Sequence, residues 1–144
     1  MPPPGMLASL LRARRGYLGI IGSDGGPRVL PVCFTWAGDV IWTAADAKPK
    51  GTEESQGLRD IGTNAKASFT VDRWDEDWSR LAWLQALGTA RILGRDDETE
   101  RVLGALADKY SQYASTPLTG PVIRIDVASW AGWSAAADGG RRRL

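Results

Sequence analysis

The chain has 144 residues, with 18 basic and 17 acidic side chains, one cysteine, seven tryptophans and no histidine. This length predicts one domain over residues 1–144, and the 43% hydrophobic and 24% charged content is ordinary for a globular protein. The absence of histidine excludes Ser-His-Asp and Cys-His catalytic arrangements and His-ligated zinc, haem or iron.

Membrane and nucleic-acid partners are not expected. No apolar run approaches the roughly 18 residues that a membrane helix needs, and no signal-peptide pattern is seen. The formal net charge of +1 gives no general reason to expect nucleic acid. A single cysteine cannot form an internal disulfide, so we expect a cytoplasmic protein. We interpret the basic end, residues 139–144, as a flexible tail.

The first third of the chain begins with apolar residues at helical spacing, which predict a short helix over residues 5–14. The period then changes to that of strands, predicted over 17–23, 28–36 and 40–45. Short Gly-containing turns separate these strands, so the sequence predicts an antiparallel meander.

The rest of the chain alternates between helical and strand patterns. A weak helical pattern after Lys50 ends at Asn64, and an alternating strand follows over 67–71. A long strand over 81–93 contains Gly88, which marks a bulge or bend. A helix is predicted to begin at Asp96 and Asp97, and its apolar face consists of Val102, Leu103, Leu106 and Tyr110. A last strand is predicted over 121–130, extended through Trp133.

These elements make a mainly β protein with six or seven antiparallel strands and three small helices. Short turns and long bent strands favour a closed barrel over an open sheet, because closure removes unpaired edges.

The segment around Lys48 and Lys50 is a candidate phosphate site. The two lysines flank a proline, follow a predicted strand and precede a predicted helix. Their ammonium groups, the Thr52 hydroxyl and the unpaired N–H groups of the helix start are able to converge on one anion. A solvated basic loop is the alternative reading of the same pattern.

Two further places carry unusual residues. Pro31 lies inside a predicted strand although it lacks an N–H, so it lies at a sheet edge, at a bulge or beside a flat ring. Cys33 has no basic neighbour in the sequence, which predicts an inert buried thiol. Residues 74–80 alternate carboxylates with indoles, including Trp78, and are typical either of a pocket mouth or interface, or of a solvated turn.

Five segments, in order, resemble one known superfamily. They are Arg28-Val-Leu-Pro-Val-Cys-Phe34, Asp46-Ala-Lys-Pro-Lys50, Leu58-Arg-Asp-Ile61 leading to Asn64, Val71-Asp-Arg-Trp-Asp-Glu-Asp-Trp-Ser-Arg-Leu81 and Trp130-Ala-Gly-Trp-Ser134. The series resembles the pyridoxamine 5'-phosphate oxidase-like split β-barrel superfamily. Within it, the sequence is most similar to the actinobacterial flavin/deazaflavin oxidoreductases that depend on coenzyme F-420.

The resemblance implies a six-stranded antiparallel split β-barrel that works as a homodimer, with cofactor sites at the subunit interface. It implies that Lys48, Lys50 and Thr52 hold the cofactor phosphate and that Pro31, Val32 and Cys33 lie along the ring. It places Trp78 near the dimer interface.

The predicted function is therefore a deazaflavin (coenzyme F-420)-dependent oxidoreductase that transfers a hydride to a small organic substrate. Two alternatives remain open: an FMN-dependent oxidoreductase, and a non-catalytic flavin or deazaflavin binder. In such enzymes the cofactor carries the chemistry, so the absence of histidine is no obstacle. No catalytic side chain and no metal site is predicted.

Overall fold

The computed structural model describes residues 5–44, 52–118, 120–136 and 142–143. Its helices are α1 (Gly5–Ala8), α2 (Thr52–Thr63) and α3 (Asp97–Lys109), with short 3-10 helices η1 (Ser9–Arg12), η2 (Trp78–Arg80) and η3 (Ser111–Ala114). Its strands are β1 (Gly16–Ile21), β2 (Pro27–Val32), β3 (Thr35–Ala37), β4 (Val40–Ala44), β5 (Lys66–Arg73), β6 (Ala82–Ile92), β7 (Val122–Ser134) and β8 (Arg142–Arg143).

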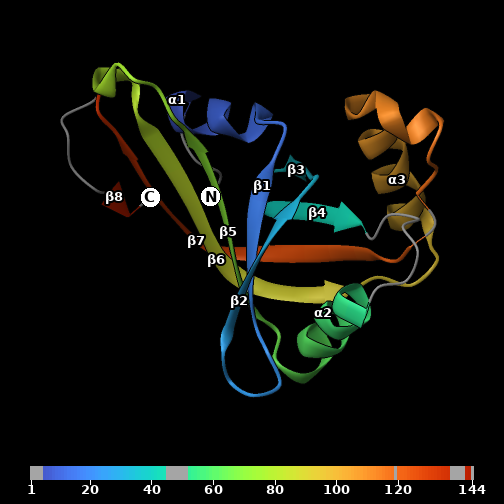
Figure 1. Ribbon diagram of the computed structural model, residues 1–144. Helices are drawn as coiled ribbons and strands as arrows, with labels where there is room; N and C mark the ends of the chain where they lie inside the picture. The colour runs from blue at the N-terminus through green and yellow to red at the C-terminus, as the bar shows by residue number, and fades with distance from the viewer. Residues whose placement is uncertain (1–4, 45–51, 119, 137–141, 144) are drawn as a thin grey trace.

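The described strands form one antiparallel sheet in the order β2-β1-β5-β6-β7-β4-β3, and β8 pairs with β7. The sheet curls into a half-barrel, and in Figure 1 the group β1, β2 and β5 crosses β4 and the first part of β7 at a steep angle. The fold is therefore the split barrel that was predicted, built from eight strand segments rather than six. The expectation of a closed barrel was wrong, because β2 and β3, at the two ends of the order, do not pair.

The predicted meander was also wrong. The single strand expected over 28–36 is two strands, and β2 and β4 lie toward opposite ends of the sheet. The chain changes direction at Cys33 and Phe34, and the Phe34 side chain is fully buried. The Phe34 ring packs against the Phe69 ring, with the centroids 4.7 Å apart. This packing explains why the strand is interrupted between β2 and β3, because a β2 that continued to pair with β1 would not place the Phe34 ring in the core.

Two long strands give the sheet its bend. β6 and β7 pair over their whole length, with a register shift between Leu87 and Gly88 that confirms the predicted bulge. A Cβ on Gly88 would lie 2.0 Å from the carbonyl oxygen of Asp126, so only glycine permits this approach of the two backbones.

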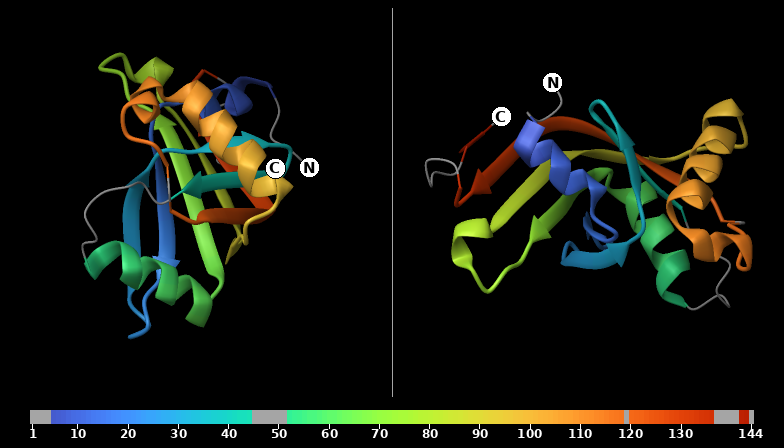
Figure 2. Two further views of the ribbon diagram at one scale, coloured as in Figure 1. Left: turned by 90° about the vertical axis from the view of Figure 1, so that its right-hand side faces the viewer. Right: turned by 90° about the horizontal axis from the view of Figure 1, so that it is seen from above.

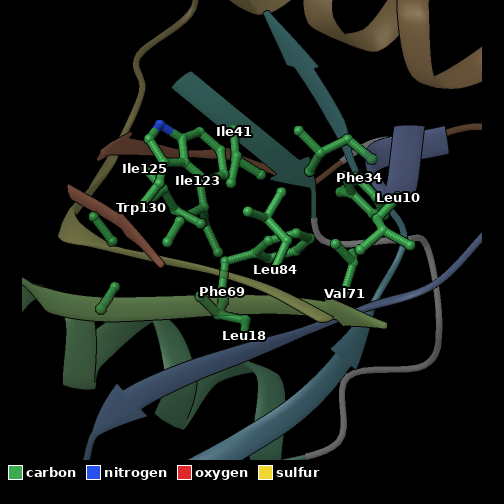
Figure 3. Packing of buried hydrophobic residues seen from close by; sticks show 14 of the residues in the cluster. Leu10, Leu18, Phe34, Ile41, Phe69, Val71, Leu84, Ile123, Ile125 and Trp130 are labelled. Carbon is green, nitrogen blue, oxygen red and sulfur yellow. The ribbon is translucent and has the colours of Figure 1, made fainter. Parts of the chain in front are cut away.

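The main core lies inside the curl and joins the sheet to α1, η1 and α2. Figure 3 shows its centre, where side chains from several strands meet; the fully buried ones include Leu18, Phe34, Ile41, Phe69, Val71, Leu84 and Ile125. Leu58 and Ile61 bring α2 to this core. A second cluster lies under α3 and contains Leu93, Val102, Leu106, Tyr110 and Val122. Asp96 caps α3 by accepting from the Thr99 N–H at 2.9 Å.

Candidate functional site

The predicted ring strand is an edge strand. Among the described strands, β2 pairs only with β1, and Pro31 lies opposite Tyr17. Pro31 is exposed and Val32 is half-buried. The edge position, one of the three predicted explanations, accounts for the proline, since a residue without an N–H costs no ladder hydrogen bond there.

The end of this strand is fastened to β4. The Thr43 hydroxyl donates to the Cys33 carbonyl oxygen at 2.6 Å, and Thr43 is nearly fully buried. Cys33, Trp42 and Ala44 all pack on the second core cluster. The contact therefore joins the predicted ring strand to the strand that leads into residues 45–51.

The predicted phosphate residues fall mostly outside the described structure. Lys48 and Lys50 lie outside the described residues. Thr52 is the first residue of α2, and its side chain lies outside the description. The structure describes the elements that precede and follow residues 45–51 in the chain. β4 ends at Ala44, which pairs with Val122 of β7, and α2 packs on the main core through Ile61.

Cys33 differs from the prediction of an inert buried thiol without a basic partner. Its side chain is only half-buried, and the fold brings Lys109 of α3 close to it. The pKa of Lys109 is lowered to about 8, chiefly by burial and then by the Arg14 cation, while Cys33 acts in the opposite direction. The sequence alone does not indicate that Lys109 and Cys33 are neighbours, because Lys109 follows Cys33 by more than seventy positions.

Tyr110 holds the same corner together. Its hydroxyl accepts from the Phe34 N–H at 3.1 Å and lies 3.0 Å from the Arg14 carbonyl oxygen. The Lys109 ammonium donates to the Phe34 carbonyl oxygen at 2.9 Å and lies 3.7 Å from the centroid of the Phe34 ring. Reasoning from sequence placed Tyr110 on the apolar face of this helix but missed Lys109, because a lysine in the last turn of a helix is ordinarily a solvated cation.

The loop around Trp78 lies elsewhere in the molecule. It joins β5 to β6 at the upper left of Figure 1, away from the end of β4, and the right-hand view of Figure 2 shows the same separation. The acidic residues organise this loop internally: Asp77 accepts from the Ser79 hydroxyl at 2.7 Å, and Asp75 pairs with Arg80 at 3.2 Å. Trp78 remains 67% exposed. Within one chain, the structure does not bring Trp78 to Cys33.

The surface of the described residues includes two open hollows among others. One is lined by Gly19, Ile20, Ile21, Pro27, Arg28, Val29, Lys66, Ala67 and Ser68 on β1, β2 and β5. The other is lined by Leu11, Arg12, Arg14, Thr35, Trp36 and Lys109.

Over the described ranges, no cluster of three His, Cys, Asp or Glu is placed to hold a metal ion. No helix in the described part of the chain is long and apolar enough to cross a membrane.

No protein-family model and no curated protein matches the chain. Solved structures do match its fold. A conserved hypothetical protein from Mycobacterium tuberculosis aligns with a TM-score of 0.75 at 18% identity, over 94% of this chain and 87% of that one. An F420 reductase aligns with a TM-score of 0.62 at 24% identity, over 89% of this chain and 98% of that one.

A heme-binding protein from Mycobacterium smegmatis aligns with a TM-score of 0.72 at 14% identity, over 99% of this chain but 60% of that one. A FAD-binding protein from Mesorhizobium loti also matches. Because all of these proteins are less than 25% identical to this chain, the matches show a shared split-barrel fold. The names of three of these proteins state F420 reductase, heme binding and FAD binding, and these properties are said of those proteins.

Proposed function

We propose that the chain binds a phosphate-bearing flavin-type cofactor, preferably coenzyme F-420, and transfers a hydride between it and a small organic substrate. The observation that carries the proposal is the hydrogen bond from Thr43 to Cys33. It fastens the edge strand that suits a ring to the strand that leads into the two lysines. The shared fold with an F420 reductase supports the choice of cofactor.

The described residues fit a flat ring. Pro31 is exposed on an edge strand and has no N–H that a ring would leave unpaired. Val32 and Cys33, both half-buried, follow Pro31 in the chain. Lys48 and Lys50, with the Thr52 hydroxyl, would bind the phosphate. When bound, the cofactor supplies the hydride chemistry, and the chain binds it, orients it and excludes water.

A flavin-type cofactor is preferred over heme for a reason in the sequence. One solved structure of the same fold is a heme-binding protein, but this chain has no histidine to serve as an iron ligand. FMN is the alternative within the flavin group, since its phosphate suits the same lysines, and a FAD-binding protein shares the fold.

The first experiment is a paired fluorescence titration of the purified protein with coenzyme F-420 and with FMN. We expect saturable, selective binding of the deazaflavin, followed by oxidation of the reduced coenzyme when a substrate panel is added. Selective FMN binding would transfer the proposal to the alternative cofactor. Binding without turnover of any substrate would favour the non-catalytic binder. If neither cofactor binds, the proposal fails.

Lys50→Ala tests the phosphate loop. We expect cofactor binding to weaken by about 1.5–3 kcal/mol, the range for a lost hydrogen bond to a charged group, which is roughly a 10- to 150-fold increase in Kd. Arg95→Ala is the control, because Arg95 is an exposed cation for which the structure shows no ion pair with any described residue. An unchanged Kd for Lys50→Ala would remove residues 45–51 from the site.

The proposed cofactor site also uses a second copy of the chain. The described surface keeps large apolar side chains uncovered, including Val29 and Trp78, each 67% exposed, and Leu87. Val29 and Leu87 lie in one row across the sheet with only Gly19 and Ser68 between them, which leaves a low strip that a second subunit can cover. We infer a homodimer in which Trp78 of one copy reaches the partner's cofactor site.

Mixing two variants tests this arrangement. Lys50→Ala and Trp78→Ala should each bind the cofactor weakly as pure dimers. Re-equilibrated together, they should regain full affinity at about a quarter of the sites, because half of the dimers are mixed and each mixed dimer has one intact site. Light scattering checks that the particles are dimers. A monomeric mass, or no recovery on mixing, would contradict the shared site.

A further inference from the structure

The second hollow lies between the end of η1, strand β3 and the last turn of α3. Its volume is about 310 Å³, and it is open to solvent. Figure 1 shows β3 between η1 and α3 in the upper half of the molecule. Leu11 and Trp36 form its apolar part, since both pack on the main core.

The polar lining of the hollow is strongly one-sided in charge. Of its six lining residues, three are the cations Arg12, Arg14 and Lys109, one is Thr35, and none is a carboxylate. Over the described ranges, no Asp or Glu lies within 4.0 Å of any of the three cations. Like charges held together without a counter-charge raise the energy of the site, and an anion would lower it.

The cations are held by contacts that leave hydrogen-bond donors available. Arg14 lies over the Tyr110 ring, 4.8 Å from its centroid. Lys109 uses one of its three N–H donors on the Phe34 carbonyl oxygen and rests against the Phe34 and Tyr110 rings. Aromatic faces and a carbonyl oxygen position a cation without neutralising it, so both side chains are oriented for a further partner.

Because Lys109 is partly buried, a bound anion would stabilise its charged form more than it would stabilise a solvated lysine. Its pKa is lowered to about 8, first by burial and then by Arg14. A bound oxyanion would supply the charge that this partly desolvated ammonium lacks.

We propose that this hollow binds an aromatic phosphate or a similar aromatic oxyanion, with Arg12, Arg14 and Lys109 contacting the anionic group and Trp36 contacting the ring. The proposal does not depend on the flavin-type function, because the hollow contains none of the residues assigned to the phosphate loop or the ring strand. Thr35 adds a hydroxyl donor at its edge.

The test uses cofactor-free protein and phenyl phosphate as the probe. Binding is followed by the indole N–H resonance of Trp36 in ¹H–¹⁵N spectra, assigned by its loss in Trp36→Phe. We expect a saturable shift with phenyl phosphate, competition by inorganic phosphate at higher concentration, and no saturable shift with phenol. A shift with phenol equal to that with phenyl phosphate would overturn the proposal, because the charge would then play no part.

Charge-removing variants make the test specific. Arg12→Gln and Arg14→Gln change exposed side chains, and each should raise the Kd about tenfold, the effect of a lost charge-assisted hydrogen bond. Lys109→Met should have at least as large an effect. Arg101→Gln, an exposed cation of α3 outside the hollow, should leave the Kd unchanged. Equal affinity in wild type, Arg12→Gln and Arg14→Gln would refute the site even if Lys109→Met does not fold.

Discussion

Replacement of Tyr110 by phenylalanine removes one oxygen atom from the corner where β2, β3 and α3 meet. The Tyr110 hydroxyl is the acceptor for the Phe34 N–H, at 3.1 Å, and its own proton is within reach of the carbonyl oxygens of Arg14 and Phe34. Phe34 lies between β2 and β3, is fully buried and belongs to neither strand ladder. Its N–H therefore has no sheet partner to return to.

The magnitude follows from these contacts. A buried N–H left without an acceptor costs about 1–3 kcal/mol, and the lost hydroxyl bond adds about 1 kcal/mol. We expect Tyr110→Phe to lower the free energy of unfolding by about 2–4 kcal/mol. At about 3 °C per kcal/mol for a chain of this size, Tm should fall by roughly 6–12 °C.

Urea unfolding, followed by tryptophan fluorescence, measures the difference directly. Tyr17→Phe is the matched control, because the Tyr17 hydroxyl makes no hydrogen bond with any described residue, and its ring contacts only the Arg15 cation among the recorded aromatic interactions. That variant should change stability by less than about 0.5 kcal/mol. A loss below that value for Tyr110→Phe would refute the argument that its hydroxyl satisfies the buried N–H of Phe34.

Three further predictions concern the bend of the sheet and the helices. The Trp42 indole N–H and then Arg124 bind the Glu98 carboxylate and lower its pKa below the ordinary 4.5. The stability that this carboxylate provides is complete above pH 4.5 and is lost as the pH falls through the lowered pKa of Glu98. Between pH 5 and 3, the unfolding free energy of wild type should therefore fall more steeply than that of Glu98→Gln. Equal slopes for the two proteins would contradict this prediction. Gly88→Ala should cost about 3 kcal/mol or more in urea unfolding, since its Cβ would lie 2.0 Å from a carbonyl oxygen, and a near-neutral effect would show that the strands can separate there. Gly104→Ala, in an open position of α3, should instead stabilise the protein by up to about 1 kcal/mol, and a loss of stability would show a contact that the structure does not have.

Much of the local structure could be predicted from the sequence, because its causes are local. Alternation over β5, the apolar spacing of α3, the Asp96 cap and the Gly88 bulge each depend on residues within a few positions of one another. The proline in a strand pattern is also a local signal and indicated the edge position of β2, whereas the ring contact of this strand came from the family resemblance and stays a prediction. The phosphate assignment of Lys48 and Lys50 stays a prediction.

Long-range placement was decided by packing. The sequence by itself determined where most helices and strands lie, and it excluded histidine-dependent chemistry by composition. Only the tertiary structure separated β2 from β3, since the break depends on where the Phe34 ring is buried against Phe69, a residue distant in sequence. Only the tertiary structure placed Lys109 beside Cys33 and the arginines near η1, because local periodicity contains no information about which cations meet across a fold.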